Sequence, residues 1–140
     1  MALRVVDVAV VARFSSCRRR GIAGTFTTLY SFPPDGGGSY APLTIDAVGN
    51  LNGTTSYGGQ LGCDGGSFGC GNVFKLTSGS GGWTYSWLYN FTGGSDGGFP
   101  VAGVTLDANG NLYGTTPFGG TSYSCSAYGI GCGVVFRVMP

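Results

Sequence analysis

The sequence of 140 residues contains no histidine, no glutamate and a single lysine, Lys75. Without histidine the chain forms neither a Ser-His-Asp nor a Cys-His catalytic arrangement, and it has no His-ligated metal site. Glutamate and lysine are good helix formers, whereas the tyrosines and phenylalanines that the chain does contain favour strands. We therefore expect an all-β fold, no enzymatic activity, no metal and no cofactor.

Charge is also scarce, and it is unevenly placed. Charged residues make up 9% of the chain, and the formal net charge is +1. Beyond residue 25 the basic residues are Lys75 and Arg137, so that part of the chain is mildly acidic. A protein that neutralises phosphates needs a basic stripe or patch. We therefore predict that nucleic acid is not a partner.

The first 25 residues differ in composition from the rest of the chain. Asp7 interrupts their apolar stretch and Arg13 follows it closely, which makes a poor signal peptide. The stretch is also too short and too charged to span a membrane. We expect residues 1–25 to be an atypical leader or a disordered segment outside the fold, and we expect no membrane span.

A long repeat covers the rest of the chain. The phrase DAVGNLNGTTSYGG at 46–59 returns 61 residues later as DANGNLYGTTPFGG at 107–120. Each period holds four strand-like runs separated by turns rich in Gly, Asp and Asn, which predicts an antiparallel meander. The runs are 26–32, 41–47, 50–56 and 72–77, then 83–91, 101–108, 111–117 and 133–139.

Four strands at this spacing make one β-propeller blade. The sequence therefore predicts antiparallel four-stranded repeats resembling two β-propeller blades, a partial propeller. The repeats cover about 26–82 and 83–140.

The repeated phrase predicts a structural hairpin turn. Its aspartate accepts hydrogen bonds from backbone N–H groups, its glycine takes the positive φ that reverses the chain, and its asparagine tolerates the exit geometry. Equivalent turns of successive repeats do not converge on one bond, which argues against a pair of catalytic carboxylates. The turn residues are Asp46, Gly49 and Asn50, then Asp107, Gly110 and Asn111.

Several spaced motifs together resemble a known family. The second copy reads LYNF, DGGFPVAGV, DANGNLYGTTPFGG and CGVVFRV, and the first reads LYSF, APLTIDAVGNLNGTTSYGG and CGNVFKL. In these motifs residues 26–140 are similar to the GloVer-repeat proteins, which are bacterial secreted or surface proteins. Asn52 departs from the pattern where the second copy has Tyr113.

The resemblance implies a β-propeller-like array outside the cytoplasm, extracellular or on the cell surface, with no activity assigned to the repeat. A closed propeller needs about four to eight blades. Two copies would therefore be part of a longer array, or would self-associate to complete a propeller.

The cysteines fall into two loops of equal spacing, CDGGSFGC at 63–70 and CSAYGIGC at 125–132, with Cys17 left over. The spacing favours the disulfides Cys63–Cys70 and Cys125–Cys132, which would fit an oxidising compartment. A zinc site built from all four is disfavoured because such sites ordinarily use closer pairs. Four reduced thiols in flexible loops are the remaining alternative.

The run WTYSWLYNF places five aromatic residues on one face of a strand by alternation: Trp83, Tyr85, Trp87, Tyr89 and Phe91. A covered face would pack one blade on the next, and an exposed face would stack sugar rings. Aromatic residues recur in the first copy at Phe26, Tyr30 and Phe32, but Trp83 and Trp87 have no counterpart there.

Three functions follow from these patterns. The first is a non-enzymatic extracytoplasmic β-propeller repeat module with a structural or surface-interaction role. The second is a carbohydrate-binding module that uses Trp83, Trp87 and Tyr85, and the third is a fragment of a propeller hydrolase. A glycan, another surface protein or a second copy of the chain would be the partner.

Overall fold

The structure is a computed structural model that describes residues 24–34, 36–59, 68–122, 124–125 and 131–140. These residues form seven strands in two antiparallel sheets, and no helix occurs among them. The predicted all-β fold is therefore confirmed. Residues 1–23 of the N-terminal segment lie outside the described residues. Over the described ranges, no helix has the length and apolar character to cross a membrane.

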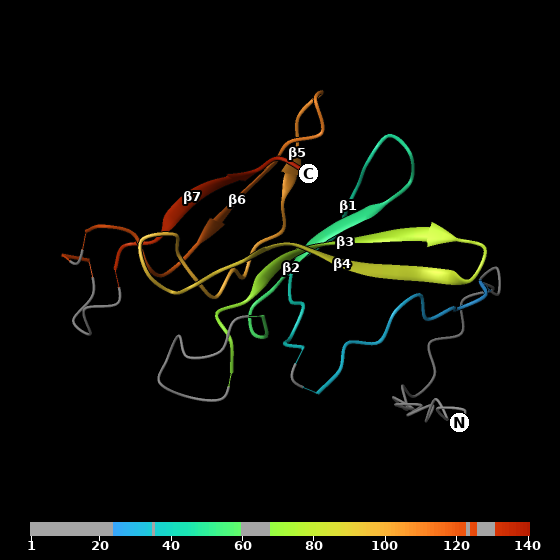
Figure 1. Cartoon of the computed structure of the whole chain (residues 1–140), viewed down its shortest axis with the longest axis horizontal. Helices are drawn as coiled ribbons and strands as arrows, with labels where there is room; N and C mark the ends of the chain where they lie inside the picture. Colours follow the sequence, from blue (N-terminus) through green and yellow to red (C-terminus); the bar gives the residue numbers. More distant parts are fainter. Residues whose placement is uncertain (1–23, 35, 60–67, 123, 126–130) are drawn as a thin grey trace, which may run out of the picture.

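The first sheet is a four-stranded meander in the order β1-β2-β3-β4. Its strands are β1 (Thr44–Ile45), β2 (Leu51–Thr55), β3 (Asn72–Gly79) and β4 (Gly82–Asn90), as Figure 1 shows. The long β3–β4 hairpin closes where Gly79 faces Gly82. The strand expected at 83–91 is therefore paired with the strands that precede it in the chain.

The second sheet has three strands in the order β5-β6-β7. These are β5 (Thr105–Leu106), β6 (Leu112–Thr116) and β7 (Val134–Val138). Both sheets place a glycine of their second strand opposite a phenylalanine of their third, Gly53 opposite Phe74 and Gly114 opposite Phe136. The sheets repeat one another strand by strand, except that β7 has no described counterpart of β4 beside it.

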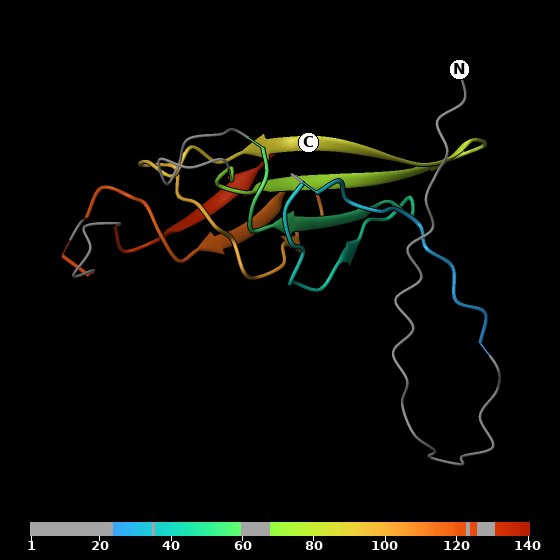
Figure 2. The same ribbon diagram turned by 90° about the horizontal axis from the view of Figure 1, so that it is seen from below.

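The strand predicted at residues 26–32 is absent, and that prediction is wrong for this chain. The segment resembles β4 in sequence, but β4 itself occupies the edge of β3 where such a strand would pair. Residues 24–34, drawn in blue in Figures 1 and 2, instead run along the first sheet. They are held by side chains, since the Phe32 ring lies 5.4 Å from that of Phe74.

The core lies between the two sheets. Its buried members are Cys70, Val73, Phe91, Val104, Leu112 and Val138. Hydroxyl groups of the first sheet also reach the backbone that leads into the second, because Thr54 Oγ1 donates to the Ala102 carbonyl at 2.9 Å and Ser56 Oγ donates to the Pro100 carbonyl at 2.6 Å. The Thr44 hydroxyl donates to the Val104 carbonyl in the same way.

A β-bulge divides the aromatic run on β4. Phe74 faces Trp87 and the next residue of β3, Val73, faces Tyr89, so Leu88 is extra on β4. A bulge of this kind reverses which residues point to each face. Trp83, Tyr85 and Trp87 therefore share the face of Phe74, while Tyr89 shares the opposite face with Val73. The prediction that all five aromatic residues share one face is corrected by this bulge.

We predict that Phe91→Ala lowers the free energy of unfolding by about 3–5 kcal/mol, because it leaves a cavity in the core between the sheets. Phe91 is fully buried and its ring lies 5.1 Å from that of Phe136. Urea unfolding followed by tryptophan fluorescence measures the change. Met139→Ala, at an exposed position, is the control and should shift stability by less than about 0.5 kcal/mol. Equal effects of the two substitutions would contradict this packing.

Candidate functional site: aromatic clefts and the repeated turns

The first repeated turn is closed by its own aspartate. Asp46 Oδ1 accepts the backbone N–H groups of Val48 at 3.0 Å and Asn50 at 2.9 Å, and Oδ2 accepts the Asn50 side-chain amide at 2.7 Å. Gly49 has a φ of 90°, which glycine adopts without strain. Lys75 Nζ lies 3.5 Å from Asp46 Oδ2. The Asn50 amide, aided by the two backbone donors and weakly by Lys75, lowers the pKa of Asp46 to about 2, against the opposing effect of burial.

The second turn repeats this arrangement. Asp107 Oδ1 accepts the N–H groups of Asn109 and Asn111, both at 2.9 Å, and Oδ2 accepts the Asn111 amide at 2.8 Å. The Tyr113 hydroxyl donates to Asp107 Oδ2 at 3.1 Å. In the first turn, the corresponding oxygen of Asp46 is instead contacted by Lys75. The Asn111 amide is the main group that lowers the pKa of Asp107. Both carboxylates are ionised at neutral pH and bonded to their own turns, which leaves neither poised to donate or take a proton.

The structure brings Asp46 close to the second turn. A small cleft of about 230 Å³ is lined by Asp46, Lys75 and residues 109–111, among others. In the ranges that the structure describes, no group of three or more Asp, Glu, Cys or His side chains could hold a metal ion.

Of the predicted disulfides, the one between Cys125 and Cys132 is confirmed. Cys70 is fully buried and disulfide-bonded. Its predicted partner Cys63 lies outside the described residues, as does Cys17.

The predicted aromatic residues of β4 divide between packing and exposure. Tyr85 is stacked between the rings of Tyr30 at 5.0 Å and Phe74 at 5.3 Å, and its hydroxyl donates to Asn72 Oδ1 at 2.9 Å. Burial raises the pKa of Tyr85 to about 12, against the opposing effect of the Asn72 hydrogen bond. Trp83 is half-buried, whereas Trp87 is 65% exposed. Tyr85 is thus a packing residue, and Trp87 presents most of its ring to solvent.

Trp87 and Tyr85 line a cleft of about 310 Å³, which Trp83 does not line. The remaining lining residues are Tyr30, Phe32, Pro33, Gly36, Gly59 and Asn72. Beside Gly59, the side-chain oxygen of Asn90 is buried without a hydrogen-bond partner among the described residues, and a Cβ built on Gly59 would meet it at 2.7 Å. The cleft thus combines aromatic walls with an adjacent unused acceptor.

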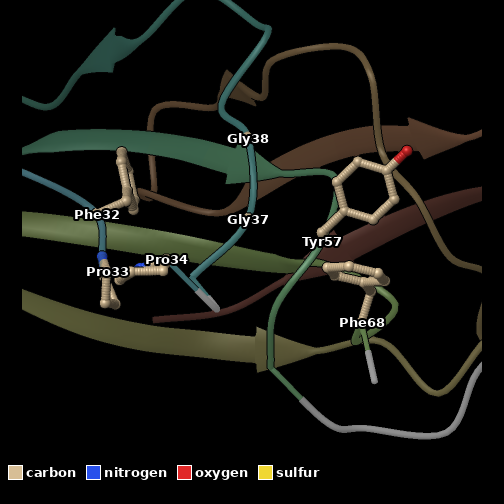
Figure 3. A pocket seen from close by; sticks show the side chains of 7 residues that line it. All are labelled: Phe32, Pro33, Pro34, Gly37, Gly38, Tyr57 and Phe68. Atoms are coloured by element: carbon tan, nitrogen blue, oxygen red, sulfur yellow. The ribbon is translucent and has the colours of Figure 1, made fainter. Parts of the chain in front are cut away.

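A larger cleft of about 600 Å³ adjoins it and shares Phe32 and Pro33. Figure 3 shows the rings of Tyr57 and Phe68 on one side of this cleft, with Phe32, Pro33 and Pro34 across from them. The Tyr57 and Phe68 ring centroids are 6.2 Å apart. The walls are apolar and the backbone of Gly37 and Gly38 lines the cleft between them.

An aromatic row that was not predicted from the sequence continues from this cleft. Tyr57 contacts Phe99 at 5.9 Å, and Phe99 contacts Phe118 at 5.9 Å. Phe99 has a φ of 56°, a conformation that bulky residues rarely adopt. A further cleft, of about 360 Å³, is lined by Tyr57, Phe99 and Phe118. The available signal was the repeat itself, because Tyr57 and Phe118 occupy the same position of the repeated phrase.

We predict that the free energy of unfolding falls between about pH 5 and pH 2. In this range acid protonates the two turn aspartates, and their stabilising contribution is lost. A carboxyl with a lowered pKa stabilises the fold above its unfolded pKa of 3.8, and that contribution is lost as the pH falls toward about 2. Asp46→Asn with Asp107→Asn should flatten the dependence of the urea midpoint on pH. Asp96, whose pKa is also lowered, remains in this variant and keeps a residual slope. An unchanged slope would contradict the role of the turns.

Comparisons of the chain with protein-family models, with curated proteins and with solved structures found no match.

Proposed function

We propose that the chain is a non-enzymatic, extracytoplasmic tandem-repeat module of β-propeller type, with a structural or surface-interaction role. One observation carries this proposal. The Phe32 ring meets Phe74 of the first sheet at 5.4 Å and 72°, and the Phe91 ring meets Phe136 of the second sheet at 5.1 Å and 66°. The two contacts are edge-to-face pairs between residues at equivalent positions of the repeat, as expected when one blade packs on the next.

The neighbouring tyrosines repeat the same arrangement. Tyr30 lies 5.3 Å from Phe32 at 84°, and Tyr89 lies 5.3 Å from Phe91 at 73°. Residues 26–32 thus meet the first sheet as the end of β4 meets the second. This agreement supports a repeating blade interface.

The chemistry of the described residues also favours a module without catalysis. Asp46 and Asp107 are used by their own turns, and the two clefts that share Phe32 are lined mainly by aromatic rings, proline and glycine. The Cys125–Cys132 disulfide is consistent with an oxidising, extracellular location.

A pair of double-mutant cycles tests the repeating interface. We expect Phe32→Leu with Phe74→Leu, and Phe91→Leu with Phe136→Leu, each to give a coupling of about 0.5–1.5 kcal/mol in the free energy of unfolding. Leucine keeps most of the apolar volume but removes the edge-to-face contact. Phe32→Leu with Phe136→Leu, which joins residues of different interfaces, is the control and should be additive. Coupling in one pair and none in the other would contradict equivalent interfaces.

Carbohydrate binding is the second candidate function, and the exposure of Trp87 favours it. Flat aromatic faces bury large apolar areas, and sugar rings offer a matching apolar face. Trp87 is 65% exposed and lines the cleft together with Tyr85, which offers an apolar ring face to a ligand.

A glycan array with purified variants tests this second candidate. We expect Trp87→Ala to weaken binding of the best glycan by about tenfold, or about 1.4 kcal/mol, through loss of the stacking face. Trp83→Ala is the matched control, because Trp83 shares the face but does not line the cleft. If Tyr57→Ala abolishes binding and Trp87→Ala does not, the glycan binds in the larger cleft and not beside Trp87. The absence of any bound glycan would refute this function.

A further inference from the structure

The outer edge of β7 has no strand partner among the described residues. In the first sheet, β3 lies between β2 and β4, but in the second sheet β7 ends the order β5-β6-β7. The two sheets also differ in how far equivalent side chains are exposed. Val73 of β3 is 0% exposed, whereas its equivalent Val135 of β7 is 79% exposed. An exposed strand edge is a template for pairing with another chain. Within the described ranges, the second sheet thus has no fourth strand beside β7 and no cover over Val135.

Residues 26–32 resemble a fourth strand in sequence, but they are not paired with any sheet. Tyr30 and Phe32 stand 59 residues before Tyr89, the last residue but one of β4, and Phe91, which follows the strand. The segment forms no strand, and Phe26 is 90% exposed. Yet it already packs on the first sheet as β4 packs on the second.

We propose that residues 26–32 of one copy add to β7 of a second copy as its fourth strand, joining chains head to tail. This inference rests on the proposed function, because it assumes that both sheets are blades of one repeating array. Addition of an extended segment to an open sheet edge is a common mode of recognition. Each copy would then give one strand and receive one.

The β3–β4 pairing sets the register of the new strand. Val73 faces Tyr89 and Phe74 faces Trp87, across the bulge at Leu88. Moved to the equivalent positions, this register places Tyr30 of one copy opposite Val135 of the other, and Thr28 opposite Phe136. Packing of the second copy's first sheet on this face would then cover Val135, as the second sheet covers Val73 within one chain.

The aromatic contacts identify the residues that would meet across the new interface. Within one chain Tyr85 stacks on Tyr30 and contacts Phe32 at 5.7 Å. Phe26 is the equivalent of Tyr85, so Phe26 of the second copy would meet Tyr89 and Phe91 of the first. Phe26 and Tyr89 are both exposed in the single chain, which leaves these partners available.

A hydrogen bond between the sheets has an equivalent as well. Thr54 Oγ1 donates to the Ala102 carbonyl in one chain. The equivalent hydroxyl, Thr115, is exposed on the second sheet, and the carbonyl equivalent to that of Ala102 belongs to Ala41. In the assembly, Thr115 of one copy would donate to Ala41 of the next.

The segment of the same chain is poorly placed to fill this edge. Tyr30 and Phe32 hold it on the Phe74 face of the first sheet, whereas the second sheet packs on the opposite, Val73 face. Figure 1 shows this segment and β7 on different sides of the first sheet. A second copy can supply the strand without breaking these contacts. Because each copy contributes two sheets, closed rings of about four to eight blades would need two to four copies.

Light scattering on the 140-residue chain and two single variants tests the proposal. We expect the wild type to have the mass of two to four chains, as about four to eight blades require. Thr28→Pro should reduce the mass to that of one chain, 14.2 kDa, because proline lacks the N–H group needed for strand pairing. Val135→Asp should do the same by placing a charge where the second copy covers β7. Thr28→Ala is the matched control and should assemble like the wild type.

Mixing the two defective variants makes the test directional. The Thr28→Pro chain keeps an intact β7 edge and the Val135→Asp chain keeps an intact segment, so the mixture should form dimers and nothing larger. A monomeric wild type, or a Thr28→Pro chain that assembles normally, would overturn the proposal. Because the ring contacts that the double-mutant cycles probe lie within one chain, intact coupling in a monomeric wild type would refute the strand exchange alone and leave the proposed blades standing.

Discussion

The fold depends on a phenylalanine ring lying over a glycine of the neighbouring strand. Gly53 faces Phe74 and Gly114 faces Phe136, and a Cβ on either glycine would lie 2.7 Å or 2.4 Å from the ring. The missing side chain lets the ring lie down on the sheet, where Phe32 or Phe91 packs on its edge. The contact between successive units thus depends on a glycine inside each sheet, Gly53 or Gly114, that leaves room for the phenylalanine ring.

The sequence revealed the local features of this chain better than their grouping. The all-β fold and the Cys125–Cys132 disulfide follow from residue types and short spacings, and both are confirmed. The turn at Asp46 also depends on residues within five positions, and the structure has the hydrogen bonds that its residue types imply. Interactions of this kind are encoded where they occur in the chain.

Grouping was harder because a repeat has a period but no visible starting point. The run 83–91 matches residues 26–32, and sequence alone does not say whether such a strand opens one unit or closes the one before it. The structure pairs it with β3. The bulge at Leu88 was hidden for a related reason, since alternation assumes that every residue advances the strand equally. The clefts beside Tyr57 depend on loops that meet only after the sheets have packed.

The bulge in β4 gives one strand two different neighbours. Before Leu88, Tyr85 turns toward Tyr30 and Phe74, and after it Tyr89 and Phe91 turn toward the second sheet. A regular strand would present all of these rings to one side and leave the other side without an anchor. A single inserted residue therefore lets β4 pack on the segment before the first sheet with one part and on the second sheet with the other.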